Sequence, residues 1–337
     1  MEGNSSQTLQ KQRLPEMDVM KGILSIMVIL GHIVFIEQRS GGVNMISHAA
    51  YAQNILVAVW TAPCNMAAFF FVTGFCSSFA QDLPHQILSD AKRLLLPSVT
   101  IVSIMSATVA LLGKDFAWSY SAPWFLWALF WAKLIFKLLC QHVKSEAVVW
   151  FLLVLMSVIG AAMMYYTPEA NRLGWQQALV FPLFLAIGAF VRKISLKPWM
   201  CYLAGGVYAV FAILTFYYLD WGPLSISAIT SVAPEKWPAY FLLATSGTLF
   251  VFQVSKLSSR SRFLQFVGKN SLIVYLMHAA FLVIAASYLK SQIVQYYDNS
   301  TFQWCFFVLM GLGALLWSCL WALVFNLPFV RWLQGKW

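Results

Sequence analysis

The stretch DVMKGILSIMVILGH, residues 18–32, decides the fold because it places charged and polar side chains on a segment apolar enough to lie in a membrane. A helix turns about 100° per residue, so one side of it, an arc of roughly 60°, carries these polar residues: Asp18, Lys21, Ser25 and His32. At about 1.5 Å per residue, His32 lies roughly 16 Å from Lys21 along the axis, near the middle of a bilayer. A polar group at that depth is costly unless it faces protein or water, so the stripe predicts a functional site.

The composition of the whole chain agrees with a membrane location. The 337 residues are 61% hydrophobic and 10% charged, and the mean hydropathy is +0.73, values that a water-soluble domain does not show. Hydrophobic runs long enough to span a bilayer occur roughly at 22–37, 55–80, 94–113, 122–140, 147–165, 176–191, 200–219, 238–254, 271–289 and 304–327. The expected fold is therefore all-α, a polytopic membrane helical bundle with about ten transmembrane helices.

The distribution of positive charge predicts the topology. With the N-terminus inside, 17 of the 22 Lys and Arg residues fall on the cytoplasmic side, which is the positive-inside pattern and puts both termini in the cytoplasm. We expect a cytoplasmic tail at 1–21, a transmembrane domain at 22–330 and a short cytoplasmic tail at 331–337. Topology accounts for most of the net charge of +10, so no nucleic-acid partner is expected, although a basic inner face also attracts a phosphate-bearing ligand.

The chain carries no familiar metal or hydrolase motif. Its six cysteines lie singly in apolar stretches without metal or redox spacing, and HExxH, GxSxG and P-loop patterns are absent. The cysteines are interpreted as packing residues, and we expect no metal.

A second polar stripe occurs in the ninth predicted span, GKNSLIVYLMHA at 268–279. Ser271, Tyr275 and His278 share one helix face, and His278 lies about 13 Å beyond Lys269. Both intramembrane histidines are thus predicted at similar depth. They either share a cavity or are separate structural residues.

Two other stretches bear on this site. In TAPCNMAAFFFVTGF, residues 61–75, Pro63 predicts a broken or kinked helix and Gly74 predicts a close helix approach. Lys133 and Lys137 lie four residues apart on one helix face, and we expect them to snorkel to the inner interface or to contact an anionic ligand.

Six segments, taken in order along the chain, resemble the acyltransferase-3 family of membrane O-acyltransferases, in particular its fucose and polysaccharide O-acetylase branch. The resemblance is carried by DVMKGILSIMVILGH (18–32), AAFFFVTGF (67–75), KRLLLP (92–97), PWFLWAL (123–129), FPLFLAIGAFVRK (181–193) and GKNSLIVYLMH (268–278). In the family an Arg precedes the first-span His by eleven positions, and here that position holds Lys21, which keeps the charge without the planar fork. Ala68 stands where the family often has Ser or Thr.

The resemblance implies a donor, an acceptor and a location. The donor is cytosolic acetyl-CoA or another acyl-CoA, the acceptor is a sugar hydroxyl on a lipid-linked or growing glycan, and the protein lies among the lipids of the bacterial inner membrane. Histidine is suited to activate a hydroxyl near neutral pH, so His32 is predicted as general base, with a transient acyl-imidazole as the open alternative.

The other candidate residues are assigned around His32. Lys21 and Asp18 orient the stripe or hold a CoA phosphate, and His278 and Tyr275 position the acceptor or stabilise the oxyanion. Further candidates for acceptor contact are Ser271, Asn270 and Trp124. The cations expected to bind CoA phosphates are Lys92, Arg93, Arg192 and Lys193.

Two other functions remain open. Many spans with a broken helix and buried polar groups also suit a secondary transporter or flippase, although the Pro63 break has no counterpart five spans later. A regulator with a degenerate site is the third alternative, given Lys21 and Ala68.

Overall fold

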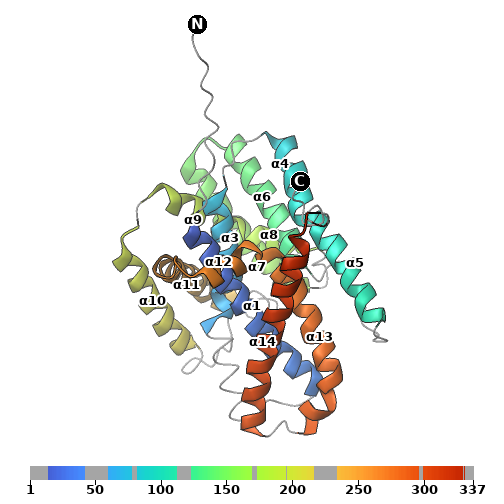
Figure 1. The fold of residues 1–337 in the computed structure, drawn as a ribbon. Helices are drawn as coiled ribbons and strands as arrows, with labels where there is room; N and C mark the ends of the chain where they lie inside the picture. Colours follow the sequence, from blue (N-terminus) through green and yellow to red (C-terminus); the bar gives the residue numbers. More distant parts are fainter. Residues whose placement is uncertain are drawn as a thin grey trace.

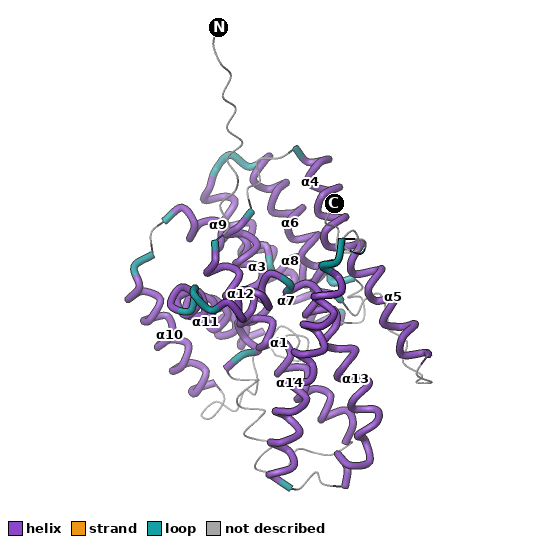
Figure 2. Tube along the Cα trace, in the orientation of Figure 1, coloured by secondary structure: helices purple, strands orange, loops and turns teal. Residues whose placement is uncertain are grey.

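The computed structural model of the chain describes residues 14–41, 60–77, 82–111, 123–168, 173–194, 196–215, 234–295, 299–328 and Val330. The predicted tail at 331–337 and the first 13 residues lie outside the described residues. All regular structure in the described ranges is helical (Figures 1 and 2). The prediction of an all-α polytopic bundle is confirmed.

The helices follow the predicted spans closely. In chain order they are α1 (Pro15–Gly41), α3 (Ala62–Cys76), α4 (Leu83–Asp90), the π-turn η2 (Ala91–Leu95), α5 (Leu96–Leu111), α6 (Trp124–His142), α7 (Glu146–Tyr166), α8 (Trp175–Val180), α9 (Pro182–Lys193), α10 (Pro198–Ile213), η5 (Pro234–Lys236), α11 (Trp237–Leu257), α12 (Arg262–Lys269), α13 (Ser271–Gln295) and α14 (Ser300–Phe325). Within the described residues, each predicted span falls mainly on one helix, except that α8 and α9 together form the sixth. Seven helical segments of the described chain are long and apolar enough to cross a membrane, and α3 and α10 are shorter apolar helices. The number that cross stays a prediction.

Helix α1 lies at the centre of the bundle and packs against α3, α11, α12, α13 and α14 (Figure 1). It begins at Pro15, before the predicted span start at residue 22. Met17, Val19 and Met20 are buried there, so the part of the predicted tail from Pro15 onward belongs to the packed bundle.

The start of α3 changes the interpretation of Pro63. The helical backbone is interrupted at Thr61, and α3 then runs from Ala62 to Cys76 with Pro63 in its first turn. Proline suits that position because the first backbone N–H groups of a helix have no intrahelical partner. The prediction of a broken helix is confirmed, and the break lies at Thr61, two residues before Pro63.

The sixth span is broken at Phe181, between α8 and α9. Pro182 has no N–H to donate, and the Phe184 N–H bonds to the Phe181 carbonyl at 3.0 Å. The carbonyl of Val180 instead lies 2.9 Å from the Ser157 hydroxyl of α7, which shares its one hydrogen between this carbonyl and that of Leu153 at 2.8 Å. A buried side chain on another helix therefore satisfies a backbone group that the break exposes.

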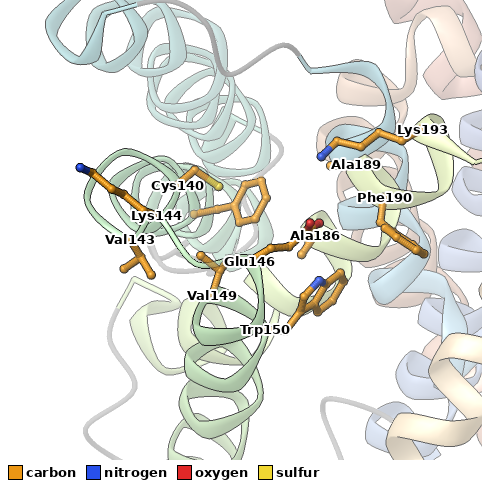
Figure 3. Close-up of a pocket in the computed structure, with 11 residues that line it drawn as sticks. Cys140, Val143, Lys144, Glu146, Val149, Trp150, Ala186, Ala189, Phe190 and Lys193 are labelled. Carbon is orange, nitrogen blue, oxygen red and sulfur yellow. The ribbon is translucent and has the colours of Figure 1, made fainter.

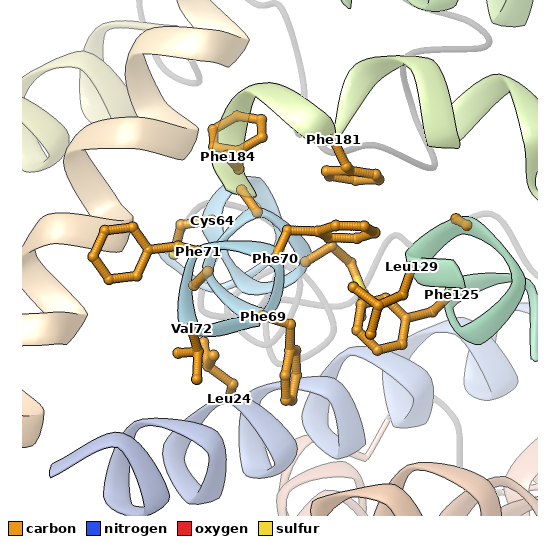
Figure 4. Close-up of a cluster of buried hydrophobic side chains, with 14 of the residues drawn as sticks. Leu24, Cys64, Phe69, Phe70, Phe71, Val72, Phe125, Leu129, Phe181 and Phe184 are labelled. Atoms are coloured by element: carbon orange, nitrogen blue, oxygen red, sulfur yellow. The ribbon is translucent and has the colours of Figure 1, made fainter. Parts of the chain in front are cut away.

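Aromatic packing fixes α3 against its neighbours (Figure 4). The ring of Phe70 stacks on Phe181 with centroids 4.2 Å apart and meets the edge of Phe125 of α6 at 5.3 Å. On another face, a Cβ at Gly74 would lie 2.7 Å from the carbonyl carbon of Leu185. The predicted close approach at Gly74 is confirmed, and it joins α3 to α9.

Candidate functional site

The two intramembrane histidines meet inside the bundle. The ring of His32 on α1 and the ring of His278 on α13 have centroids 4.8 Å apart, with their planes at 71°. The side chain of His278 is buried, at 1% exposure, whereas His32 is half-buried. The prediction that both lie at similar depth is confirmed.

Hydrogen bonds to the backbone define which nitrogen of each ring is free. Nδ1 of His32 lies 2.9 Å from the Val28 carbonyl, and Nδ1 of His278 lies 2.9 Å from the Val274 carbonyl. A carbonyl oxygen only accepts, so Nδ1 carries the hydrogen in both rings. In the neutral ring, Nε2 then keeps a lone pair, which is the form that a general base requires. The Nε2 atom of His278 is buried without a hydrogen-bond partner.

Tyr275 extends this site toward α6. Its ring centroid lies 6.1 Å from that of His278 and 5.3 Å from that of Phe125. Ser271, on the same predicted face, is the first residue of α13 and is half-buried. The face of α13 thus brings Tyr275 and His278 together, as predicted from their spacing.

The N-terminal end of the α1 stripe is held by local bonds. Lys21 Nζ lies 3.0 Å from the Asp18 carboxylate, whose side chain is 3% exposed. The Ser25 hydroxyl donates to the Lys21 carbonyl at 2.8 Å. Asp18 therefore orients Lys21, and the Lys21 side chain remains 28% exposed.

A glycine crossing that sequence reasoning missed adjoins this ion pair. A Cβ at Gly268 of α12 would lie 2.6 Å from the Asp18 carbonyl carbon, and one at Gly22 of α1 would lie 3.0 Å from that of Leu264. The backbones of α1 and α12 are thus in contact. The available signal was that each glycine adjoins a lysine at the N-terminal end of a polar stripe, Lys21–Gly22 and Gly268–Lys269.

Two residues predicted to contact the acceptor make structural contacts. The buried Asn270 amide donates to the Phe266 carbonyl at 2.9 Å, and its oxygen accepts from Asn326 at 2.8 Å, which ties α14 to the start of α13. Trp124, the first residue of α6, stacks on Phe181 with centroids 6.3 Å apart. Contact of either residue with an acceptor stays a prediction.

The four predicted phosphate-binding cations occupy three places. Lys92 and Arg93 are exposed on η2. An Arg192 nitrogen lies 3.4 Å from the carbonyls of Phe75 and Ser77, where it caps the end of α3. Lys193 lines a pocket.

That pocket lies between α6, α7 and α9 and has a volume of about 280 Å³. It is lined by Phe136, Cys140, Val143, Lys144, Glu146, Val149, Trp150, Ala186, Ala189, Phe190 and Lys193. In Figure 3 the side chains of Lys193 and Glu146 extend toward the space between α7 and α9, whereas the ammonium of Lys144 points away. The pocket thus combines an apolar wall with the ammonium of Lys193 and the carboxylate of Glu146.

The two lysines of α6 face protein. Lys133 pairs with Asp90 at the end of α4, and both side chains are largely buried. The Lys137 side chain is also buried, at 2% exposure. The expectation that these lysines snorkel to the inner interface is therefore wrong, because α4 and η2 cover this part of α6, and contact with an anionic ligand stays a prediction.

Comparison with known proteins supports an acyl-transfer activity. A family model described as an acyltransferase domain matches residues 14–323. Searches of curated proteins and of solved structures found no significant match. The match spans nearly the whole chain, from the first residue before α1 into α14. The chain therefore belongs to the acyltransferase-3 family, and it is a multi-pass membrane acyltransferase.

Proposed function

We propose that this protein is an O-acyltransferase that moves an acetyl or other acyl group from cytosolic acyl-CoA to a sugar hydroxyl. The acceptor is a cell-surface or lipid-linked glycan at the bacterial inner membrane. The observation that carries the proposal is the His32–His278 pair, in which backbone bonds at Nδ1 leave basic Nε2 atoms inside the bundle.

In this proposal His32 acts as the general base. A sugar hydroxyl is a weak nucleophile, so it gains from losing its proton to Nε2 as its oxygen attacks the thioester carbonyl. The C–S bond then breaks, and the thiolate takes the proton back from His32. The assignment favours His32 because its ring is half-buried and because it lies on the face of α1 that also carries Asp18 and Lys21.

The positive groups near the cytoplasmic side support a phosphate-bearing donor. Lys193 presents its ammonium at a pocket with apolar walls, and Lys92 and Arg93 are exposed on η2. Ammonium and guanidinium groups form strong charge-assisted hydrogen bonds with phosphate. We propose that these groups and the partly exposed Lys21 hold the phosphates of acyl-CoA.

The test is acyl transfer in membranes that contain the wild-type protein, His32→Ala or His142→Ala. His142 is a matched control because its Nδ1 makes the same 2.9 Å bond to a carbonyl four residues earlier, in Leu138, while its side chain is exposed. The membranes receive radiolabelled acetyl-CoA and a lipid extract of the native host.

We expect label in a glycan or glycolipid fraction with wild type and His142→Ala, and none with His32→Ala at equal expression. Equal labelling by His32→Ala would remove His32 from the chemistry. Absence of labelling with all three would reject this donor and acceptor. Label that stays on wild-type protein after acid quench would show an acyl-histidine step instead of direct transfer.

A further inference from the structure

We infer that Nε2 of His278 is a second binding point for the acyl acceptor, so that the site selects a sugar with two neighbouring hydroxyls over one with an isolated hydroxyl. This inference rests on the proposed function, and it adds a substrate class to it. It is drawn from the hydrogen-bond capacity of the two imidazoles.

The first step concerns what His278 can bind. Its Nδ1 hydrogen is used by the Val274 carbonyl, so the neutral ring offers only an acceptor, at Nε2. A neutral ring in this tautomer has no N–H left for an oxyanion, which disagrees with the oxyanion role considered from the sequence. A group that donates a hydrogen is the partner that fits.

The second step concerns why a partner is needed. The Nε2 atom of His278 is buried without a hydrogen-bond partner, and buried polar atoms in proteins are nearly always satisfied. The neighbouring polar ring, His32, has its own Nδ1 bound to the backbone and likewise presents an acceptor. Two neutral acceptors cannot satisfy each other, so each needs its own donor.

The third step concerns which substrate supplies two donors. The reacting end of a thioester, its sulfur and carbonyl oxygen, offers only acceptors, so the donors come from the acyl acceptor. Two hydroxyls on adjacent sugar carbons are about one hydrogen-bond length apart. With bonds of about 2.8 Å at each end, they can reach two nitrogens on rings whose centroids are 4.8 Å apart. One hydroxyl reacts at His32, and its neighbour donates to His278.

The experiment combines enzyme variants with altered acceptors. The wild-type protein, His278→Phe and His278→Gln are supplied with labelled acetyl-CoA and octyl β-D-glucoside or its monodeoxy analogues, and also with the native lipid extract. Phe keeps a ring that fills the site beside His32 but lacks the acceptor atom, and Gln restores an acceptor oxygen. Product NMR identifies the acylated hydroxyl and hence the analogue that lacks its neighbour.

For wild type we expect kcat/KM to fall at least tenfold when the neighbouring hydroxyl is removed, because the buried Nε2 loses its donor. For His278→Phe, kcat/KM on the intact sugar should fall by a similar factor, and it should be the same for the sugar that lacks the neighbouring hydroxyl. His278→Gln should recover part of the wild-type preference for the intact sugar. The KM for acetyl-CoA should stay unchanged in all three proteins.

Three results would overturn the inference. A wild-type preference that survives in His278→Phe would show that another residue reads the second hydroxyl, and a raised KM for acetyl-CoA would place His278 on the donor instead. Transfer by wild type to the native extract but to no octyl glycoside with paired hydroxyls would leave the proposed function standing while rejecting this substrate class. Failure of wild type on every acceptor would reject the proposed function itself.

Discussion

Replacing Gly268 with alanine should separate α12 from α1 and impair the histidine pair without altering any reacting group. A Cβ at Gly268 would lie 2.6 Å from the Asp18 carbonyl carbon, and closer still to its oxygen, whereas ordinary contacts begin at 3.4 Å. The obstacle is backbone on a central helix, so it cannot rotate away as a side chain would. The helices must part by roughly 1 Å.

The magnitude follows from two opposing effects. Alanine favours a helix over glycine by about 1 kcal/mol, but overpacking typically costs about 1–3 kcal/mol and more where backbones collide, so we expect a net loss of stability. Helix α12 leads through Asn270 into α13, which carries His278. A shift of about 1 Å at His278 relative to His32 is expected to reduce transfer by on the order of 100-fold.

The assay measures acyl transfer per molecule of folded protein, together with thermal stability in detergent. Gly206→Ala is the control, because a Cβ there meets nothing within 4 Å, and it should match or slightly exceed wild-type stability. Wild-type activity and stability in Gly268→Ala would refute the crossing as the element that sets the spacing of the histidines.

Three further predictions test other parts of the structure. Lys133→Met should lower stability by about 3–5 kcal/mol because it leaves the largely buried Asp90 carboxylate unpaired, and adding Asp90→Leu should recover much of this in a thermal-shift cycle. Ser157→Ala should lose about 0.6–1.7 kcal/mol, since the Val180 carbonyl at the helix break loses its donor; unchanged thermal stability would contradict this. Lys193→Ala should raise the KM for acyl-CoA several-fold, because a phosphate contact is lost, whereas Lys144→Ala, whose ammonium points out of the same pocket, should leave it unchanged.

The sequence predicted the features that depend on a single helix. Periodicity placed Asp18, Lys21, Ser25 and His32 on one stripe, and the structure joins the first three through an ion pair and a hydroxyl bond. The similar depth of His32 and His278 could also be predicted, because axial rise fixes how far His32 lies from Lys21 on α1 and approximately how far His278 on α13 lies from Lys269, at the end of α12.

Features that depend on which helices meet could not be predicted. Lys133 was expected to snorkel to the inner interface or to contact an anionic ligand, because nothing local marks Asp90, 43 residues away, as its partner. The same holds for Ser157, whose partner, the Val180 carbonyl, lies 23 residues away and lacks its helical N–H donor because the span breaks before Pro182. The periodicity of one helix predicts on which face of the helix a residue lies, but it does not predict which other helix packs against that face.

The histidine tautomer lies between these cases. The bond from Nδ1 to the carbonyl four residues earlier is local to a helix, and the exposed His142 makes it as well as His32 and His278. The bond itself is therefore no mark of a functional site. The consequence of this bond depends on where the histidine lies. The Nδ1 hydrogen is used within the residue's own helix, so only Nε2 can interact with the surroundings of that helix. At His142 these surroundings are the exposed surface, whereas at His32 and His278 they include another histidine at the same depth, and this meeting of two imidazole rings is what tertiary packing adds to the sequence pattern.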